Sequence, residues 1–256
     1  MKIAMLGAGD FGTALGGVLE GNGHDVSYYD PALVGSDLSR TVEGADFIVL
    51  CVPSGVVMDV VSKIPKDVPM IVTTKGIMDI GVFSEFSDWM VMSGPGYADD
   101  VKAKHDTIMT VTDDRIARLF ACNYMSFDYT DDRKGVLLCG SLKNIYAIGA
   151  GYRNLICNSP EWKEYIRMAV SEMKAILQAN GAKADTVNLA CGVKDLELTC
   201  RLPSRNYEYG MKLANDSSYE SNKTVEGVSA LDAVKNGDIE IPDGVLIFDS
   251  IMDLRR

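Results

Sequence analysis

A glycine-rich segment near the start of the chain limits the possible folds most strongly. Residues 7–12 read GAGDFG, which has the spacing Gly-x-Gly-x-x-Gly, and they separate an apolar run, Lys2–Leu6, from a helix-like stretch. Glycines between a strand and a helix allow a tight turn and let a pyrophosphate rest on the helix N-terminus. The motif alone is weakly specific, but this context predicts a dinucleotide site that uses Gly7, Gly9, Asp10, Phe11 and Gly12.

Two carboxylates near this segment bear on the choice of dinucleotide. Asp30 ends the second predicted strand, where a carboxylate can bind both ribose hydroxyls of the cofactor. No Lys or Arg follows until Arg40, so nothing there favours a 2′-phosphate, and NAD is predicted over NADP. Asp10 is harder to accommodate, because a carboxylate in a phosphate-binding loop repels the ligand unless it points away or caps the helix.

The first half of the chain alternates short apolar runs with helical stretches, which is typical of a parallel sheet covered on both faces. We expect helices over 11–20, 55–62 and 115–123. The predicted strands are 2–6, 25–29, 46–51, 70–73, 90–92, 107–111 and 125–129.

After Asp131 and Asp132 the pattern changes, and helical periodicity continues to the C-terminus with breaks at Ser159-Pro160, Gly181, Pro203 and Gly237. We therefore expect a dinucleotide-binding Rossmann domain over residues 1–132 and a helical substrate domain over 133–256. The predicted fold class is α/β, with a doubly wound parallel sheet followed by an all-helical domain.

The composition and net charge of the chain argue against several classes of function. The chain has 256 residues with 25 Lys and Arg against 36 Asp and Glu, a net charge of −11. Such an acidic surface disfavours nucleic acid and anionic lipid. The longest strongly apolar run, Phe47–Val52, is too short to span a bilayer, and the N-terminus has no signal-peptide pattern. We expect a cytoplasmic protein whose partner is a small molecule.

The cysteines and histidines do not predict a metal site. None of the six cysteines forms a Cys-x-x-Cys pair, and most have apolar neighbours, so reduced thiols are favoured over disulfides or metal ligands. Only two histidines are present, too few to favour a histidine-rich metal site or a histidine-based proton relay.

Lys143 is the single charge in an apolar helical stretch, residues 135–151. A helix that is apolar all round is buried, and an ammonium there is unfavourable unless it meets a carboxylate or a cleft. Desolvation would lower its pKa towards the range useful for proton transfer. The alternative is a lysine that reaches solvent or forms a structural ion pair. The residues around Lys143 leave both open.

Two segments further on favour the chemical reading of Lys143. Asp195 and Thr199 are four residues apart and share a helix face, so Asp195 is a candidate partner for Lys143. Ser204 is placed to cap a following helix, and Arg205 and Asn206 with the backbone amides would suit a phosphate or carboxylate.

Taken together, the chain resembles the NAD-dependent glycerol-3-phosphate dehydrogenase family over most of its length. The matching segments occur in the order of the family and span both predicted domains: 7–15, 52–54, 74–77, 93–95, 142–145, 191–196 with 199–200, 204–206, and 225–228.

The resemblance implies a role for each matched residue. Lys143 would donate a proton to the C2 carbonyl oxygen of dihydroxyacetone phosphate and take it back in glycerol 3-phosphate oxidation. Lys75, Asp195 and Thr199 would surround the reacting centre with support from Asn144, while Arg205 and Asn206 would hold the substrate phosphate. Pro53 and Glu226 would lie near the cofactor.

This chain also departs from the pattern of the family. It is shorter, the glycine-rich loop before the central helix is compressed into residues 152–162, and Gly96 stands where Ser or Asn is usual. Two alternatives therefore remain open: a related reductase of another small hydroxy acid or phosphorylated ketone, and a non-catalytic dinucleotide sensor. A homodimer is also possible.

Overall fold

The computed structural model describes residues 1–76 and 80–255, so Ile77 of the matched segment 74–77 lies outside the described residues. The chain divides into two compact units. The first comprises Met1–Thr74 and Ile80–Arg133, and the second begins at Lys134. Lys75 and Gly76 group with the second unit although they follow a strand of the first.

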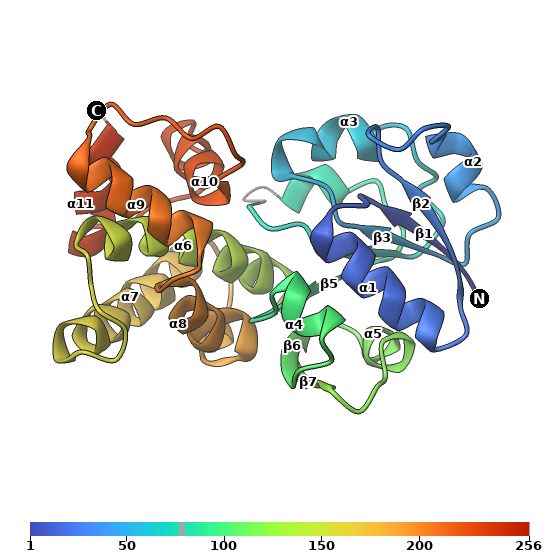
Figure 1. The fold of residues 1–256 in the computed structure, drawn as a ribbon, viewed down its shortest axis with the longest axis horizontal. Helices are drawn as coiled ribbons and strands as arrows, with labels where there is room; N and C mark the ends of the chain where they lie inside the picture. The colour runs from blue at the N-terminus through green and yellow to red at the C-terminus, as the bar shows by residue number, and fades with distance from the viewer. Residues whose placement is uncertain (77–79, 256) are drawn as a thin grey trace. The chain divides into compact units, whose positions relative to one another are not determined.

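A seven-stranded sheet forms the centre of the first unit, in the order β2-β1-β3-β4-β5-β6-β7 (Figure 1). All seven predicted strands are present: β1 Lys2–Leu6, β2 Asp25–Tyr29, β3 Phe47–Leu50, β4 Met70–Val72, β5 Trp89–Ser93, β6 Thr107–Val111 and β7 Met125–Tyr129. The order in which the strands are added to the sheet reverses between β1 and β3. In sheets of this kind, ligands bind at that point, beside the carboxyl ends of the strands.

The predicted doubly wound sheet is confirmed with one difference, because β5 and β6 are antiparallel while every other neighbouring pair is parallel. Only Met92 with Val111 and Ser93 with Thr110 pair across this junction. A buried strand has the same apolar run in either direction, so the pattern that predicted the strand carried no information about its direction.

Both faces of the sheet are covered. Alternate residues such as Ile3, Met5 and Val49 join one apolar cluster with side chains from α1 Asp10–Gly21, α4 Ala98–Lys102 and α5 Asp114–Leu119. Their neighbours Ala4 and Leu6 point to the opposite face and are also fully buried. The remaining short helices of this unit are α2 Leu38–Val42, η1 Ser54–Val56, α3 Val57–Val61 and η2 Ile80–Phe83.

The second unit is helical, and no strand occurs among its described residues. Its long helices, α6 Arg133–Tyr152 and α7 Pro160–Ala179, are joined by a short loop in which Ser159 caps α7 by accepting a hydrogen bond from the backbone of Trp162. The later helices are η3 Ala184–Asn188, η4 Ala190–Lys194, α8 Asp195–Thr199, α9 Arg205–Asn215, α10 Glu226–Lys235, α11 Leu246–Met252 and η5 Asp253–Arg255.

Helix α6 is buried continuously from Gly135 to Gly151, as its composition predicts. A second buried charge, Glu172 of α7, accepts hydrogen bonds from the Tyr146 hydroxyl and from the backbone N–H groups of Ile247 and Phe248, at 3.0, 2.8 and 3.0 Å. These contacts fasten α11 to α6 and α7. No helix among the described residues combines the length and the apolar character needed to cross a membrane.

Candidate active site

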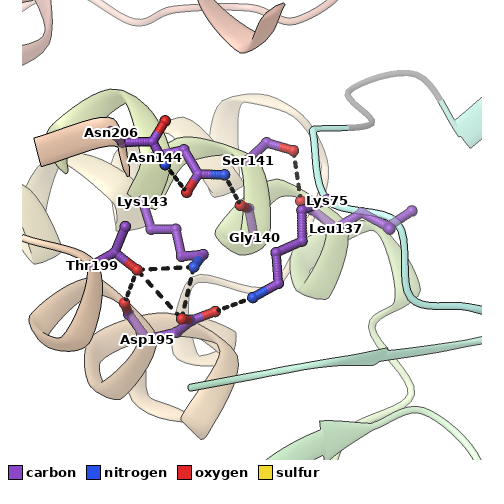
Figure 2. A network of polar contacts seen from close by, with 9 residues as sticks. All are labelled: Lys75, Leu137, Gly140, Ser141, Lys143, Asn144, Asp195, Thr199 and Asn206. Atoms are coloured by element: carbon purple, nitrogen blue, oxygen red, sulfur yellow. Dashed lines mark hydrogen bonds and ion pairs between the residues drawn. The ribbon is translucent and has the colours of Figure 1, made fainter. Parts of the chain in front are cut away.

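Lys143 lies in the middle of α6 and is only 4% exposed. Its Nζ donates hydrogen bonds to Asp195 Oδ1 at 2.7 Å and to Thr199 Oγ1 at 2.9 Å (Figure 2). The ammonium does not reach bulk water, and the predicted partnership with Asp195 is confirmed. Among the described residues, none accepts its third hydrogen.

The hydroxyl of Thr199 is oriented by its own helix. Its Oγ1 donates to the backbone oxygen of Asp195 at 2.6 Å, as the predicted spacing of four residues allows. Because its hydrogen is used there, Oγ1 presents lone pairs to Lys143. Thr199 therefore acts as an acceptor that fixes the direction of the ammonium.

A single turn of π-helix, Ala190–Lys194, leads into Asp195 and was not predicted from the sequence. Gly192 makes the turn possible, since a Cβ at this position would lie 2.0 Å from the backbone oxygen of Val187. π-Turns occur often at functional sites, where they re-aim the side chains that follow. Gly192 was the only signal of this turn in the sequence, and a glycine alone does not distinguish it from an ordinary bend.

Lys75 brings a second cation to the same carboxylate (Figure 2). Its Nζ lies 3.3 Å from Asp195 Oδ2, so each carboxylate oxygen faces one ammonium. The side chain of Lys75 is 23% exposed and that of Lys143 is 5% exposed, which makes Lys75 the more accessible of the two cations. Two ammonium groups around one carboxylate leave a local excess of positive charge.

This environment lowers the pKa of Lys143 to about 8. Burial is the largest cause, the nearby Lys75 adds to it, and Asp195 opposes it by favouring the charged form. Near neutral pH the amine therefore carries a proton that it can release and regain. Burial also raises the pKa of the neighbouring Cys200 thiol, so this thiol is not an activated nucleophile. All six cysteines are thiols outside any disulfide.

Asn144 and Asn206 form a buried amide relay beside the lysines (Figure 2). Asn206 Nδ2 donates to Asn144 Oδ1 at 2.9 Å, and Asn144 Nδ2 donates to the backbone oxygen of Gly140 at 3.1 Å. Asn206 Oδ1 also accepts from the backbone of Gly227 at 2.9 Å. Asn206 thus ties α9 to α6 and α10, a structural task that the sequence did not predict for it.

Arg205 is the first residue of α9, and its side chain is exposed. Ser204 caps this helix as predicted, its hydroxyl accepting from the backbone of Tyr207 at 3.4 Å. Within the part of the chain that the structure describes, Arg205 has no ion-pair partner. Its guanidinium is therefore available for an external anion, and the buried Asn206 follows it in the chain.

The glycine loop of the first unit has the geometry that a bound pyrophosphate requires. Gly7 has φ +105°, and a Cβ there would lie 2.4 Å from the backbone oxygen of Cys51. A Cβ on Gly12 would lie 2.0 Å from the oxygen of Gly7, so both positions need glycine. Gly9, by contrast, has open space where a Cβ would stand, and no side chain caps α1 at this residue. An open cradle at a helix N-terminus fits a dinucleotide phosphate.

The other predicted cofactor residues occupy varied environments. Asp30 accepts from the backbone of Ala8 at 3.0 Å and of Ala32 at 2.9 Å, which places its carboxylate beside the loop. Phe11 packs on the apolar cluster under α1. Pro53 is exposed where the chain leaves β3, and Glu226 begins α10 in the second unit.

Asp10 does not cap α1, because Gly9 holds the cap position. Its side chain is 92% exposed, and Oδ1 lies 3.5 Å from Nζ of Lys102. The sequence left two arrangements open for this carboxylate, pointing away from the loop or capping the helix. The structure has the first, because the side chain points into solvent.

A glycine loop at the switch point of a Rossmann sheet, followed by a helical unit with a buried lysine–aspartate pair, defines a nicotinamide-dinucleotide-dependent dehydrogenase. Comparison with known proteins makes the class specific. The family model described as "NAD-dependent glycerol-3-phosphate dehydrogenase C-terminus" matches residues 132–249. This match agrees with the family that the sequence resemblance predicted, whose members are NAD(P)-dependent dehydrogenases.

Full-length relatives support this assignment. The glycerol-3-phosphate dehydrogenase [NAD(P)+] of Oceanobacillus iheyensis is 29% identical, over 95% of this chain and 88% of its own. The enzyme of the same name from Brucella ovis is also 29% identical, over 89% and 84%. Among solved structures, glycerol-3-phosphate dehydrogenase from Coxiella burnetii has a TM-score of 0.84 at 25% identity, covering 100% of this chain and 94% of that one.

Proposed function

We propose that this chain interconverts dihydroxyacetone phosphate and glycerol 3-phosphate with NAD(H), and that Lys143 moves the proton. The observation that carries this proposal is the Lys143 ammonium. It is buried, held by Asp195 and Thr199, left with one unused hydrogen, and tuned to a pKa of about 8. A lysine that served only as a structural cation would need neither the unused hydrogen nor the lowered pKa.

Lys143 donates its remaining hydrogen to the C2 carbonyl oxygen during reduction and accepts a proton from the C2 hydroxyl during oxidation. A nicotinamide dinucleotide, when bound, supplies or accepts the hydride at C2. Asp195 and Thr199 hold Nζ in place, and Lys75 adds positive charge where the carbonyl oxygen becomes negative. Asn144 accepts a hydrogen bond from Asn206 and so orients it, and the pair stabilises the site beside the lysines.

Arg205 binds the substrate phosphate, with the second amide hydrogen of Asn206 as a further donor. A guanidinium presents two parallel N–H groups to phosphate oxygens, which suits an exposed arginine without an internal partner. Asn206 already uses one amide hydrogen and its carbonyl oxygen inside the fold, so only one hydrogen remains for the ligand.

Gly7, Gly9 and Gly12 hold the cofactor pyrophosphate at the N-terminus of α1, with Phe11 supporting the helix from below. Asp30 binds the adenosine ribose, since each of its oxygens accepts one backbone hydrogen bond and keeps a lone pair for a hydroxyl. A 2′-phosphate beside this carboxylate would be repelled, which favours NAD. Pro53 and Glu226 complete the cofactor contacts by analogy with the family.

The direct test is oxidation of NADH and NADPH with dihydroxyacetone phosphate as the electron acceptor. We expect rapid oxidation of NADH, a kcat/KM at least about tenfold lower with NADPH, and negligible turnover of unphosphorylated dihydroxyacetone. NADH that binds without being oxidised by any ketose phosphate would instead support a dinucleotide sensor. Equal rates with and without the phosphate would point to a different substrate.

The two directions should depend on pH in opposite ways, because they need opposite states of Lys143. We expect kcat/KM for ketone reduction to fall as the pH rises through about 8, and kcat/KM for alcohol oxidation to rise over the same range. Lys75→Gln should move both midpoints to higher pH, because Lys75 lowers the pKa of Lys143. Profiles whose midpoints are unchanged in Lys75→Gln would contradict this assignment.

A further inference from the structure

The negative charge of the chain is concentrated in the unit that carries the glycine loop. By sequence count, residues 1–74 and 80–133 contain nine Lys and Arg against nineteen Asp and Glu, while the second unit has sixteen against seventeen. A unit with a net charge of −10 repels the pyrophosphate of a dinucleotide over distances of about 10 Å at ordinary salt. Any cation near the loop therefore matters more than it would on a neutral surface.

Asp10 adds to this repulsion at the least favourable place. It is the first residue of α1, directly after Gly9, whose open space forms the cradle described above. A carboxylate stabilises the N-terminus of a helix by interacting with its dipole, but a phosphate uses the same dipole. Although its side chain points into solvent, Asp10 still places a negative charge at the N-terminus of α1, where it opposes the binding of a phosphate.

Lys102 is the cation that faces Asp10. It ends α4, and its Nζ lies 3.5 Å from Asp10 Oδ1. The neighbouring Val101 is 2% exposed and packs in the same apolar cluster as Ala14 and Leu15 of α1. Core packing between α1 and α4, rather than the exposed ion pair itself, therefore keeps the ammonium beside the loop.

We infer that Lys102 is an affinity determinant for the dinucleotide, because it offsets the charge of Asp10 at the N-terminus of α1. The inference rests on the proposed binding of NAD by the glycine loop. The partner of Lys102 in the structure is Asp10, so the inference assigns it an effect through the local potential. The chain thus tolerates a carboxylate in its phosphate-binding loop by pairing it with a lysine from a second helix.

The test is a charge-compensation cycle measured as the Kd for NADH by fluorescence titration, without turnover. At low ionic strength, Lys102→Ala should raise Kd by about three- to tenfold, and Asp10→Asn should lower it by a similar factor. The double variant should return close to the wild-type Kd, since its net local charge equals that of the wild type. The effects should shrink in about 0.5 M salt, where exposed charges are screened.

Lys63→Ala is the matched control, because Lys63 also forms an exposed pair, with Asp59 at 2.5 Å, in the same unit. It removes the same charge without touching α1 or α4, and its Kd should stay within about twofold of the wild type. A Lys102→Ala variant that binds NADH like the wild type, or no more weakly than Lys63→Ala, overturns this inference alone. A wild-type chain that binds no NADH overturns the proposed function and the inference with it.

Discussion

Replacement of Lys143 by methionine is expected to lower kcat for dihydroxyacetone phosphate reduction by about 10²–10⁴-fold, the usual worth of a positioned proton donor. Methionine keeps most of the apolar stem within α6 and removes only the ammonium. Asp195 keeps Lys75 as a partner at 3.3 Å, so the variant does not leave an unpaired buried carboxylate. The loss should therefore reflect proton transfer rather than collapse of the site.

Two measurements separate this chemical loss from a folding defect. The Kd of Lys143→Met for NADH should stay within about twofold of the wild type, because the glycine loop belongs to the other unit. Lys194→Met, which changes an exposed lysine next to Asp195, should retain nearly full kcat. A Lys143→Met enzyme that keeps wild-type turnover in both directions would remove Lys143 from the mechanism.

The features of this molecule that could be predicted from the sequence are those that a local pattern of residues along the chain indicates. The glycine spacing marked the loop after β1, and the apolar stretch 135–151 marked a fully buried helix with one charge. A spacing of four residues placed Asp195 and Thr199 on one helical face, which the structure confirms. Each of these signals follows directly from a periodicity or from the burial of a charge.

The features that escaped prediction depend on tertiary contacts. The five-residue helices α2 and α4 are too short to show a period, so the pairing of Lys102 with Asp10 had no sequence signal. The antiparallel β5–β6 pair depends on how the chain returns to the sheet. Asn206 was predicted to bind phosphate, and only the contacts with Asn144 and Gly227 reveal its bridging role.

Removal of the Arg205 side chain should separate phosphate binding from catalysis. We expect Arg205→Ala to raise the KM for dihydroxyacetone phosphate by about 30- to 100-fold, which is typical of a lost charge-assisted contact to an anion. Its kcat should change much less, because Lys143, Asp195 and Thr199 hold one another independently of this side chain. Folding should be unaffected, since Arg205 is exposed and Ser204 still caps α9.

Arg201→Ala is the matched control, because Arg201 is an exposed arginine in the preceding loop that makes a weak contact, at 3.8 Å, with the sulfur of Cys157. Its KM should stay near that of the wild type. Inorganic phosphate should inhibit the wild type competitively and inhibit Arg205→Ala much more weakly, because both ligands need the same guanidinium. An unchanged KM in Arg205→Ala would contradict the proposed role of Arg205, and it would favour a substrate that carries no phosphate.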